Sequence, residues 1–346
     1  MISTSAVMNV AMVGVGNFGA ARRDLMRKTG LFRIVRAYDL NPAALAAARE
    51  QDGAEPASSY EELLATPGIE AVVISTGAKF HAVQMLAAMA RGLHVFVEKP
   101  LCSNQGEIDA LVAAQKKSKV VVGMGHADNT RQPHLHAMKR MIEAGDLGTL
   151  ATFEKTTAHS GGLEIQPGDW RGDPEKNPGG MLFQCGVHAL HDLLYLFGPV
   201  ARVSCTMRYD LHTTQTADVA HCILTFASGL TGTLNAYHIT PYRHTFSIFG
   251  TAGALHKRDR YGPEGTTLTF QPRKRGPYEE ETPVPIVEDD EADTGNLRSF
   301  HAAVRTGSSC YPALLDGARA VGVVFAAEES AKSHQEVVLP PVPASR

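Results

Sequence analysis

Long apolar runs, an excess of one charge and closely paired cysteines are all missing from this chain of 346 residues. No apolar stretch reaches the ~18–20 residues that a membrane-spanning helix needs. The formal net charge of −3 gives no electrostatic reason to expect nucleic acid or an anionic membrane as a partner. The five cysteines form no CxxC pair, so cysteine spacing indicates no metal site.

The first residues also lack the features of a targeting signal. The segment MISTSAVMNVAMVGVG has neither a basic n-region nor a cleavage-site pattern, and its apolar part fits a first strand. Together with an odd number of scattered cysteines, this predicts a cytoplasmic protein with reduced thiols. A content of 44% hydrophobic and 20% charged residues is typical of a packed globular enzyme, and the length predicts two domains.

Residues 1–124 alternate between short apolar segments and helical ones. Segments rich in Val and Ile, such as NVAMVGV, AVVIST and HVFVE, are separated by helical segments such as PAALAAAREQ. Near-continuous apolar strands that alternate with helices indicate a parallel sheet covered on both faces. We therefore expect residues 1–124 to form a doubly wound α/β domain.

The pattern changes after about Gly125. Longer segments with period-two alternation follow, among them TLATFEKTTAH, RVSCTMRYD, ADVAHCILTF and LTGTLNAYH, which predicts a largely antiparallel sheet. GGMLFQCGVHALHDLLYLFG interrupts them as an amphipathic helix, and EVVLP is expected as a last strand. Residues 271–295, rich in proline and charge, are expected to form an exposed loop.

Residues 125–346 are thus predicted to form an α+β domain with a large, mostly antiparallel, open sheet. The segments NLRSFHAAVRTG and LLDGARAVGVVFAAEESAKS add two helices, and the C-terminal helix is expected to be able to pack back on the first domain. The uncovered face of an open sheet needs a partner. Alternating apolar positions in ADVAHCILTF and LTGTLNAYH predict that a second copy of the chain binds there, giving a homodimer or homotetramer.

A glycine-rich turn follows the first predicted strand. It consists of Gly14, Val15, Gly16, Asn17, Phe18 and Gly19. Glycines at this spacing permit a tight turn, close approach of a pyrophosphate and helix–strand packing in a Rossmann dinucleotide site. Asp39 ends the second predicted strand, where its carboxylate would accept hydrogen bonds from a ribose 2′-hydroxyl and repel a 2′-phosphate, which favours NAD over NADP. An α/β turn that binds no dinucleotide is the alternative.

Two further segments carry chemistry suited to an alcohol substrate. Glu98-Lys99-Pro100 follows HVFVE directly, at the carboxyl edge of the sheet, and a lysine there can stabilise a developing alkoxide. His188 begins a helix, with His191 and Asp192 at i+3 and i+4 on a face they can share. A histidine can take a hydroxyl proton while hydride leaves the same carbon. A solvated charge pair and a structural histidine are the alternatives, and without HExxH or CxxC no metal is expected.

Together these segments resemble the Gfo/Idh/MocA oxidoreductase family, which includes glucose-fructose oxidoreductase and inositol dehydrogenase. The resemblance extends from Asn9 to about Pro340 and depends on GVGNFG with Asp39, STGAKFHAVQMLAAMARGLHVFVEKPL, GGMLFQCGVHALHDLLYLFG and the two terminal helices. It implies an NAD-dependent dehydrogenase that acts on a secondary alcohol of a sugar, a polyol or a related cyclic alcohol.

The resemblance also implies roles for individual residues. Lys99 would bridge the nicotinamide ribose and the substrate, His188 would be the catalytic proton acceptor, and Pro100 would follow a cis bond. The other cofactor-binding residues would be Ser75, Thr76, Gly77, His81 and Glu98. The other substrate-binding residues would be His126, His159, Trp170, Arg171 and Gln184, with Arg131 close to His126 in sequence. For Trp170 and Arg171, a plain core aromatic and a structural ion pair stay open.

Two positions depart from the family pattern. The aspartate that is common four residues before the histidine is replaced by Gln184, which carries no charge. The second acidic position is His191, and Asp192 is displaced by one residue, which rotates a helical side chain by ~100°. The acid–base partner of His188 is therefore left open.

These departures leave two other functions under consideration. One is an NAD-dependent glycoside hydrolase or lyase that oxidises its sugar transiently. The other is a non-catalytic NAD-binding regulator. The substrate itself would be selected by loops around residues 159–171 and 235–245.

Overall fold

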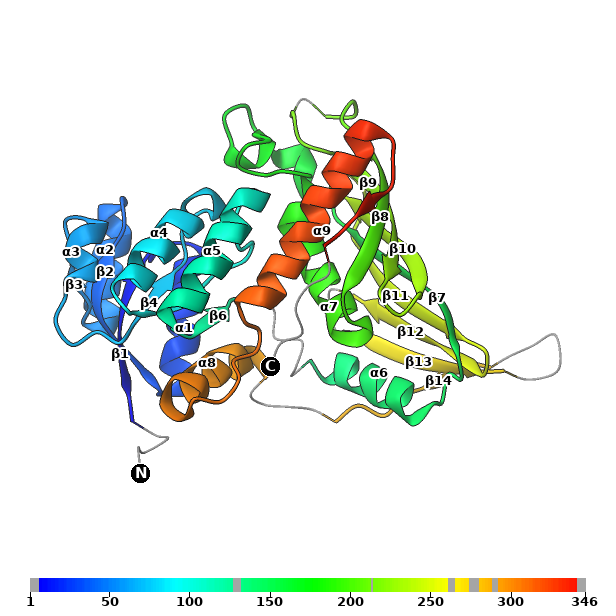
Figure 1. The fold of residues 1–346 in the computed structure, drawn as a ribbon, viewed down its shortest axis with the longest axis horizontal. Helices are drawn as coiled ribbons and strands as arrows, with labels where there is room; N and C mark the ends of the chain where they lie inside the picture. The colour runs from blue at the N-terminus through cyan, green and yellow to red at the C-terminus, as the bar shows by residue number, and fades with distance from the viewer. Residues whose placement is uncertain are drawn as a thin grey trace. The chain divides into compact units, whose positions relative to one another are not determined.

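The chain folds into two compact units, drawn in Figure 1. The computed structural model describes residues 6–126, 132–212, 214–260, 265–273, 280–287 and 292–340. The first unit comprises Met1–Asp128 and Glu291–Ala318, and the second comprises Asn129–Asp290 and Arg319–Arg346. Among the described residues, no helix combines the length and the apolar content that crossing a membrane requires.

A six-stranded parallel sheet forms the centre of the first unit, as the alternating pattern predicts. Its strands are β1 (Met8–Val13), β2 (Phe32–Tyr38), β3 (Glu55–Pro56), β4 (Ala71–Ile74), β5 (His94–Val97) and β6 (Val122–Met124). They lie in the order β3-β2-β1-β4-β5-β6, with every pairing parallel. The order reverses direction between β1 and β4, so the carboxyl ends of these two strands flank the switch point where doubly wound sheets bind ligands.

Helices connect these strands and cover the sheet. They are α1 (Phe18–Thr29), α2 (Pro42–Asp52), α3 (Tyr60–Leu64), α4 (Ala78–Ala90) and α5 (Gln105–Ser118). Since β–α–β crossovers are right-handed, and the sheet grows in opposite directions from β1 and β4, α1 and α4 lie on opposite faces. The four residues of β4 are all buried, which explains their continuous apolar sequence.

Helix α8 (Gly295–Thr306) belongs to the first unit although it follows the whole second sheet in sequence. Phe300 of α8 is fully buried, and its ring lies 5.6 Å from that of Phe96 on β5. A β carbon at Gly123 of β6 would approach the Phe300 ring to 2.9 Å, so the glycine permits this close packing. The core of the parallel sheet is therefore completed by a distant segment.

A nine-stranded, mostly antiparallel sheet dominates the second unit, as predicted. Its strands are β7 (Leu150–Ala158), β8 (Val200–Arg208), β9 (Val219–Phe226), β10 (Thr231–Tyr237), β11 (Arg243–Gly250), β12 (Gly253–Asp259), β13 (Thr267–Pro272), β14 (Thr282–Pro283) and β15 (Val337–Val338). The order is β14-β13-β12-β11-β7-β10-β9-β8-β15, and β7 with β10 is the parallel pair.

The expected exposed loop over residues 271–295 is wrong in part. Strand β13 extends to Pro272, β14 pairs with β13, and α8 begins at Gly295. Proline content misled the prediction, because Pro283 occupies an outermost strand, where a missing N–H is tolerated. Residues 274–279 and 288–291 of this segment lie outside the described part of the chain.

The helices of the second unit are α6 (Pro133–Ala144), a π-helical turn (Leu182–Gly186), α7 (Val187–Phe197) and α9 (Leu314–Ser333), which begins in the first unit. Phe153 of β7 and Phe226 of β9 both pack against Phe197 of α7. The apolar residues of β9 share this covered face, whereas Ile223 on the other face is 52% exposed. Most of the alternating apolar residues of β9, which predicted a surface for a second copy of the chain, thus pack into the core under the helices.

Candidate active site

The glycine turn after β1 brings two backbone segments into contact. Gly14 has φ +79°, and a β carbon there would lie 2.7 Å from the carbonyl carbon of Ser75. A β carbon at Gly19 would lie 2.0 Å from the carbonyl oxygen of Gly14. Larger residues would force the turn away from β4 and from α1. Both glycines are therefore required by packing, and the turn leads directly into the N-terminus of α1.

Asn17 and Phe18 form the entrance to α1. Asn17 adopts φ 44° and its side chain makes no capping hydrogen bond. The N–H groups of Gly19 and Ala20 donate to backbone carbonyl oxygens of the turn. The side chain of Phe18 is 70% exposed. A helix N-terminus after a glycine turn favours a phosphate group, because the helix dipole attracts negative charge.

The carboxylate of Asp39 is anchored to the glycine turn. Its Oδ2 accepts hydrogen bonds from the backbone N–H groups of Val15, at 2.7 Å, and Gly16, at 3.2 Å. Its Oδ1 accepts from the N–H of Asn41 at 2.8 Å. The structure thus brings Asp39 to the position beside the turn that the sequence predicts, with a fixed orientation.

The loop between β4 and α4 contributes a buried hydroxyl. Ser75 Oγ is buried and has no hydrogen-bond partner among the described residues. Thr76 Oγ1 donates to Gln84 Oε1 over 2.6 Å, and Gly77 is the N-cap of α4. A buried hydroxyl without a partner costs free energy unless a ligand or water completes its hydrogen bonds. Ser75 therefore indicates a ligand at this edge of the sheet.

His81 connects two loops of the site. Its side chain is fully buried, with Nδ1 2.8 Å from the carbonyl oxygen of Pro100 and Nε2 2.8 Å from that of Thr76. Burial lowers the pKa of His81, while the two carbonyl groups act in the opposite direction. Since both ring nitrogens face the protein, His81 positions the loops after β4 and β5 and has no ring nitrogen left for direct cofactor binding.

Glu98 forms a buried ion pair at the end of β5. Arg22 Nε of α1 donates to Glu98 Oε1 over 2.7 Å, and the two side chains are only 8% and 12% exposed. A β carbon at Gly125 would approach Glu98 Oε2 to 2.5 Å, so the carboxylate is enclosed on that side as well. The same guanidinium group stacks over Phe96, with Arg22 Cζ 4.9 Å from the ring centroid.

Lys99 lies at the same edge as the glycine turn. The Lys99–Pro100 peptide bond is cis, which the resemblance implies. Lys99 Nζ lies 5.9 Å from the ring centroid of Phe18, so the ammonium group stands close to the start of α1. The turn, Asp39, the loop after β4 and Lys99 therefore gather at the carboxyl edge of one sheet. A glycine cradle, an anchored carboxylate and a buried hydroxyl are together suited to a dinucleotide.

His126 ends the parallel sheet in a buried position. Its side chain is 0% exposed, and its carbonyl oxygen accepts a hydrogen bond from Asn296 Nδ2 at 2.9 Å. Asn296 Oδ1 lies in turn 3.4 Å from Arg22 Nη1. This burial weighs against the expected substrate contact of His126. Arg131, which the sequence pairs with it, lies outside the described residues.

In the second unit, the predicted site residues Gln184 and His188 share one helix face with Cys185. Between Met181 and Leu190, only Gln184, Cys185 and His188 are partly exposed, and the rest are buried. The π-helical turn ends at Gly186 and α7 continues from it, which places Gln184 and His188 close together on this face. π-Helical turns often occur at functional sites.

His191 is buried, and Asp192 forms an ion pair with a strand of the sheet. His191 is 1% exposed, and burial, with a smaller effect of Lys155, lowers its pKa to about 3. Asp192 instead pairs with Lys155 of β7, which itself stacks over Phe246 at 4.4 Å. The one-residue displacement thus directs Asp192 to an ion pair on the sheet.

His159 lies next to the π-helical turn. Its Nδ1 accepts a hydrogen bond from the N–H of Gly161 at 2.9 Å, and its Nε2 lies 3.6 Å from Cys185 Sγ. The ring of His238 is 5.1 Å away in an edge-to-face arrangement. Burial lowers the pKa of His159, and burial together with neighbouring cations lowers that of His238 to about 4. Both rings are therefore neutral near pH 7.

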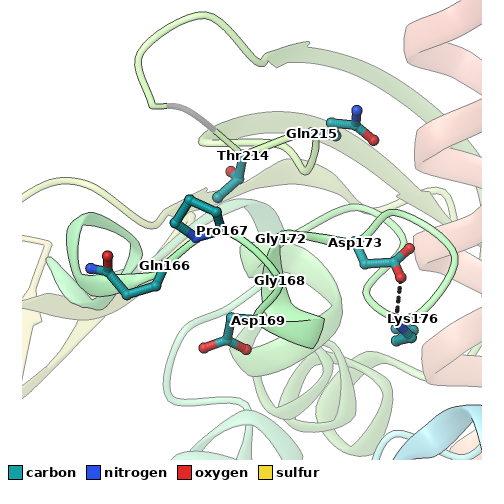
Figure 2. A pocket seen from close by; sticks show the side chains of 9 residues that line it. All are labelled: Gln166, Pro167, Gly168, Asp169, Gly172, Asp173, Lys176, Thr214 and Gln215. Carbon is teal, nitrogen blue, oxygen red and sulfur yellow. Dashed lines mark ion pairs between the residues drawn. The ribbon is translucent and has the colours of Figure 1, made fainter.

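Trp170 and Arg171 form a surface pair. Trp170 is 42% exposed, Arg171 stacks over its ring at 4.9 Å, and Asp169 forms an ion pair with Arg171 at 3.3 Å. A cavity of about 300 Å³ adjoins this turn. Figure 2 shows its lining, which consists of Gln166, Pro167, Gly168, Asp169, Gly172, Asp173, Lys176, Thr214 and Gln215. Trp170 and Arg171 are not part of that lining. Within the described residues, no group of three or more acidic, His or Cys side chains is arranged to hold a metal ion.

Comparison with known families agrees with this geometry. Residues 8–126 match the model described as "Oxidoreductase family, NAD-binding Rossmann fold", and residues 135–256 match the "GFO/IDH/MocA C-terminal domain". The chain belongs to the Gfo/Idh/MocA oxidoreductase family. Its first unit is accordingly an NAD-binding Rossmann domain, and the expected fold is confirmed.

Several known proteins resemble this chain. An uncharacterized oxidoreductase of Streptococcus pneumoniae is 31% identical, and the match spans 56% of this chain but only 51%, about half, of that protein. The scyllo-inositol 2-dehydrogenase (NAD(+)) of Bacillus subtilis is 28% identical over 71% of this chain and 72% of its own. A putative NADPH-dependent oxidoreductase of Desulfitobacterium hafniense shares the fold, with a TM-score of 0.89, 24% identity, and coverage of 96% and 98%.

Sequence reasoning missed the side chains that support the predicted site residues within each unit. Three residues were not predicted although they contact residues that were. Their partners are Glu98 for Arg22, the carbonyl oxygen of His126 for Asn296, and Asp192 for Lys155. Arg22 gave one signal, because it is a charged residue one turn into a helix that must cover the sheet. Asn296 gave none, since it reaches the site from a helix 170 residues beyond His126.

Proposed function

We propose that this chain transfers a hydride between NAD and a secondary alcohol of a sugar, a polyol or a related cyclic alcohol. The observation that carries the proposal is the gathering of the glycine cradle, the anchored Asp39 and the Lys99 ammonium at one edge of the parallel sheet. The scyllo-inositol 2-dehydrogenase relative supports a cyclic alcohol as the substrate class.

The roles of the residues follow from their chemistry. The glycine turn and the N-terminus of α1 would hold the pyrophosphate, and Asp39 would accept hydrogen bonds from the adenosine ribose. Bound NAD supplies the hydride acceptor, which no side chain can provide. Lys99 donates a hydrogen bond to the alcohol oxygen and stabilises its negative charge, while His188 takes the hydroxyl proton. His81 and Glu98 position the two loops, and His159, Trp170, Arg171 and Gln184 are proposed to contact the substrate.

Substitution of Lys99 tests this assignment. Lys99→Ala should lower kcat by about 10²–10³-fold, the loss seen when a charge-stabilising donor is removed. The Kd for NAD should change by no more than about twofold, because the phosphates and the adenosine ribose bind elsewhere. Turnover is followed by NADH absorbance on a panel of sugars and cyclic polyols, and NAD binding by calorimetry.

The matched control is Lys28→Ala, which removes a 53% exposed lysine on the same unit. It should match the wild type in both assays. Equal loss of turnover and NAD affinity in Lys99→Ala would instead assign Lys99 to the cofactor alone. Product formation without net NADH would indicate a hydrolase or lyase with transient oxidation, and no turnover on any member of the panel would favour an NAD-binding regulator.

We further propose a cytoplasmic homo-oligomer. The five cysteines are free thiols in the structure, which agrees with a reducing compartment. The face of the second sheet that carries Ile223 is the proposed contact between copies, because it exposes a branched apolar side chain on β9. Light scattering should give the mass of a dimer or tetramer, and Ile223→Glu should shift it toward the monomer. A monomeric wild-type chain would refute the contact.

A further inference from the structure

We propose that Cys205 and Cys222 are a modification site at which a small peroxide joins the two sulfurs in a reversible disulfide. Cys205 lies on β8 and Cys222 on β9, and the register of these strands places the two residues directly opposite each other. Their sulfur atoms are 3.2 Å apart, and both are free thiols. The pair lies within the second unit, and the proposal does not depend on the proposed function.

The backbone of the two strands brings the pair within reach of a disulfide. The N–H of Cys205 donates to Ser330 Oγ at 2.9 Å, so it points away from β9. The N–H of Phe226 donates to the carbonyl oxygen of Leu230, on the side of β10, and Cys222 four residues earlier on β9 points the same way. Cys205 and Cys222 are therefore a non-hydrogen-bonded pair, whose Cα atoms are about 4.5 Å apart. Disulfides occur at Cα separations of about 4.4–6.8 Å.

The two sulfurs are shielded from solvent but close to each other. Residues directly opposite in an antiparallel pair point to the same face, and here Cys205 is 7% and Cys222 is 2% exposed. The contact with Cys205 Sγ, together with burial, raises the pKa of Cys222, so its thiolate is scarce near pH 7. Reaction with a dissolved oxidant is therefore slow. Once one sulfur is oxidised, however, the other thiol is already beside it.

Hydrogen peroxide supplies the oxidising equivalents. One sulfur, as the thiolate, attacks an oxygen of the peroxide, the O–O bond breaks, and a sulfenic acid forms while the released hydroxide takes up the thiol proton as water. The second thiol attacks the sulfenic sulfur, the S–S bond forms, and the S–O bond breaks with release of a second water. The two thiols lose two electrons and two protons in total, and the peroxide gains them. A thiol reductant reverses the cross-link by disulfide exchange.

A cavity gives a small reagent access to the pair. Its volume is about 430 Å³, and both cysteines line it together with polar side chains such as Ser330 and Asn235. Hydrogen peroxide is uncharged and can exchange hydrogen bonds with such groups. Ile223 lines the same cavity, so a second copy bound at that face would slow the entry of peroxide. The test therefore measures the end point of the reaction and not its rate.

Peptide mapping tests the cross-link. The full-length protein is incubated with hydrogen peroxide until no further change occurs, denatured in iodoacetamide and digested with trypsin without a reductant. Trypsin cleaves after Arg202 and Arg208, so the two cysteines fall in separate peptides that a disulfide would join. The joined peptide, two hydrogens lighter than the two thiol peptides together, should be the main cysteine product and should disappear with dithiothreitol. A nonreducing gel should show that the bond lies within one chain.

Variants separate access of the oxidant from pairing of the sulfurs. In Cys205→Ser the joined peptide should be absent, and Cys222 should instead be captured as a sulfenic acid by dimedone added on denaturation. Cys310→Ser is the matched control and should form the joined peptide like the wild type. Circular dichroism verifies that each variant is folded, and Cys205→Ala replaces Cys205→Ser if that variant is not. The proposal would be overturned if both sulfurs remained thiols, if either reached the sulfinic acid without a cross-link, or if the main cross-link involved a different cysteine.

Unfolding tests whether the cross-link fits the native sheet. The disulfide joins residues 17 positions apart and thereby restricts the unfolded chain. The urea midpoint of the cross-linked protein, followed by the fluorescence of Trp170 in the same unit, should therefore rise by about 1 M. Peroxide-treated Cys205→Ser should show no rise. An unchanged or lower midpoint in fully cross-linked wild type would contradict the proposal, because it would mean that the sheet must distort to form the bond.

Discussion

The buried pair between Arg22 and Glu98 allows a quantitative test of how the site is held. Arg22→Met keeps an unbranched side chain over Phe96 but removes the charge that faces Glu98 Oε1 at 2.7 Å. Both side chains are about one-tenth exposed, so water cannot replace the guanidinium without rearrangement. Removing one partner of a buried pair costs about 3–5 kcal/mol, because the other charge is left buried alone.

The double variant separates this cost from a general loss of packing. Arg22→Met with Glu98→Gln leaves no unpaired charge, so it should be at least about 1.5 kcal/mol more stable than the sum of the two single changes predicts. Urea unfolding is followed by far-UV circular dichroism, which reports on the whole chain, and by the fluorescence of Trp170, which lies in the second unit. Arg22→Met should shift the dichroism midpoint more than the Trp170 midpoint.

Three outcomes would refute this reasoning. Arg22→Met could lower the free energy of unfolding by less than about 0.5 kcal/mol, which is the range of surface substitutions. The two single changes could be additive, which would mean that the residues do not interact. The Trp170 signal could shift as much as the dichroism signal, which would mean that the effect is not confined to the first unit.

Two further predictions concern cofactor choice and acid stability. Asp39→Ser should lower the Kd for NADP relative to that for NAD by about tenfold or more, because a carboxylate repels a 2′-phosphate. Calorimetric titration measures both Kd values, and substitution of the exposed Asp24 by Ser is the control. An unchanged ratio would show that Asp39 acts only on the glycine turn. The pKa of His238 is lowered to about 4 from its ordinary value near 6.5, so the unfolded chain binds a proton at a higher pH than the folded chain does. The contribution of His238 to the free energy of unfolding should therefore be fully present above pH ~6.5. It should fall by up to about 1.4 kcal/mol per pH unit toward pH ~4. Urea midpoints measured across this range should fall less steeply in His238→Gln, and equal slopes would exclude His238 as the cause.

Local signals were enough to predict which residues gather at the carboxyl edge of the parallel sheet. The glycine turn, Asp39 and the segment after β5 each follow a strand directly, and the carboxyl ends of parallel strands lie at one edge of a sheet. Each residue could therefore be placed from its own neighbours in sequence. His81 was predicted as a cofactor ligand from its motif, and nothing in the sequence indicated that both of its ring nitrogens would lie 2.8 Å from backbone carbonyl oxygens.

Long-range pairing was not predictable from one sequence. Arg22 meets Glu98 across 76 residues, and Lys155 meets Asp192 across 37. Charged residues inside strands also concealed structure, since Lys257 and Asp259 of β12 pair with each other at 2.5 Å on a face that an alternation analysis expects to be apolar. An ion pair inside a strand leaves no hydrophobic pattern in the sequence.

The return of α8 to the first unit determines how this chain could be divided. A fragment that ends near residue 128 would lack Phe300, so the edge of Phe96 and the surface of Gly123 would face water. It would also lose Asn296, the contact that holds Arg22 and the carbonyl of His126. The first unit of this chain could therefore be transferred only as two separate pieces, and a simple cut at the end of β6 would leave its core incomplete.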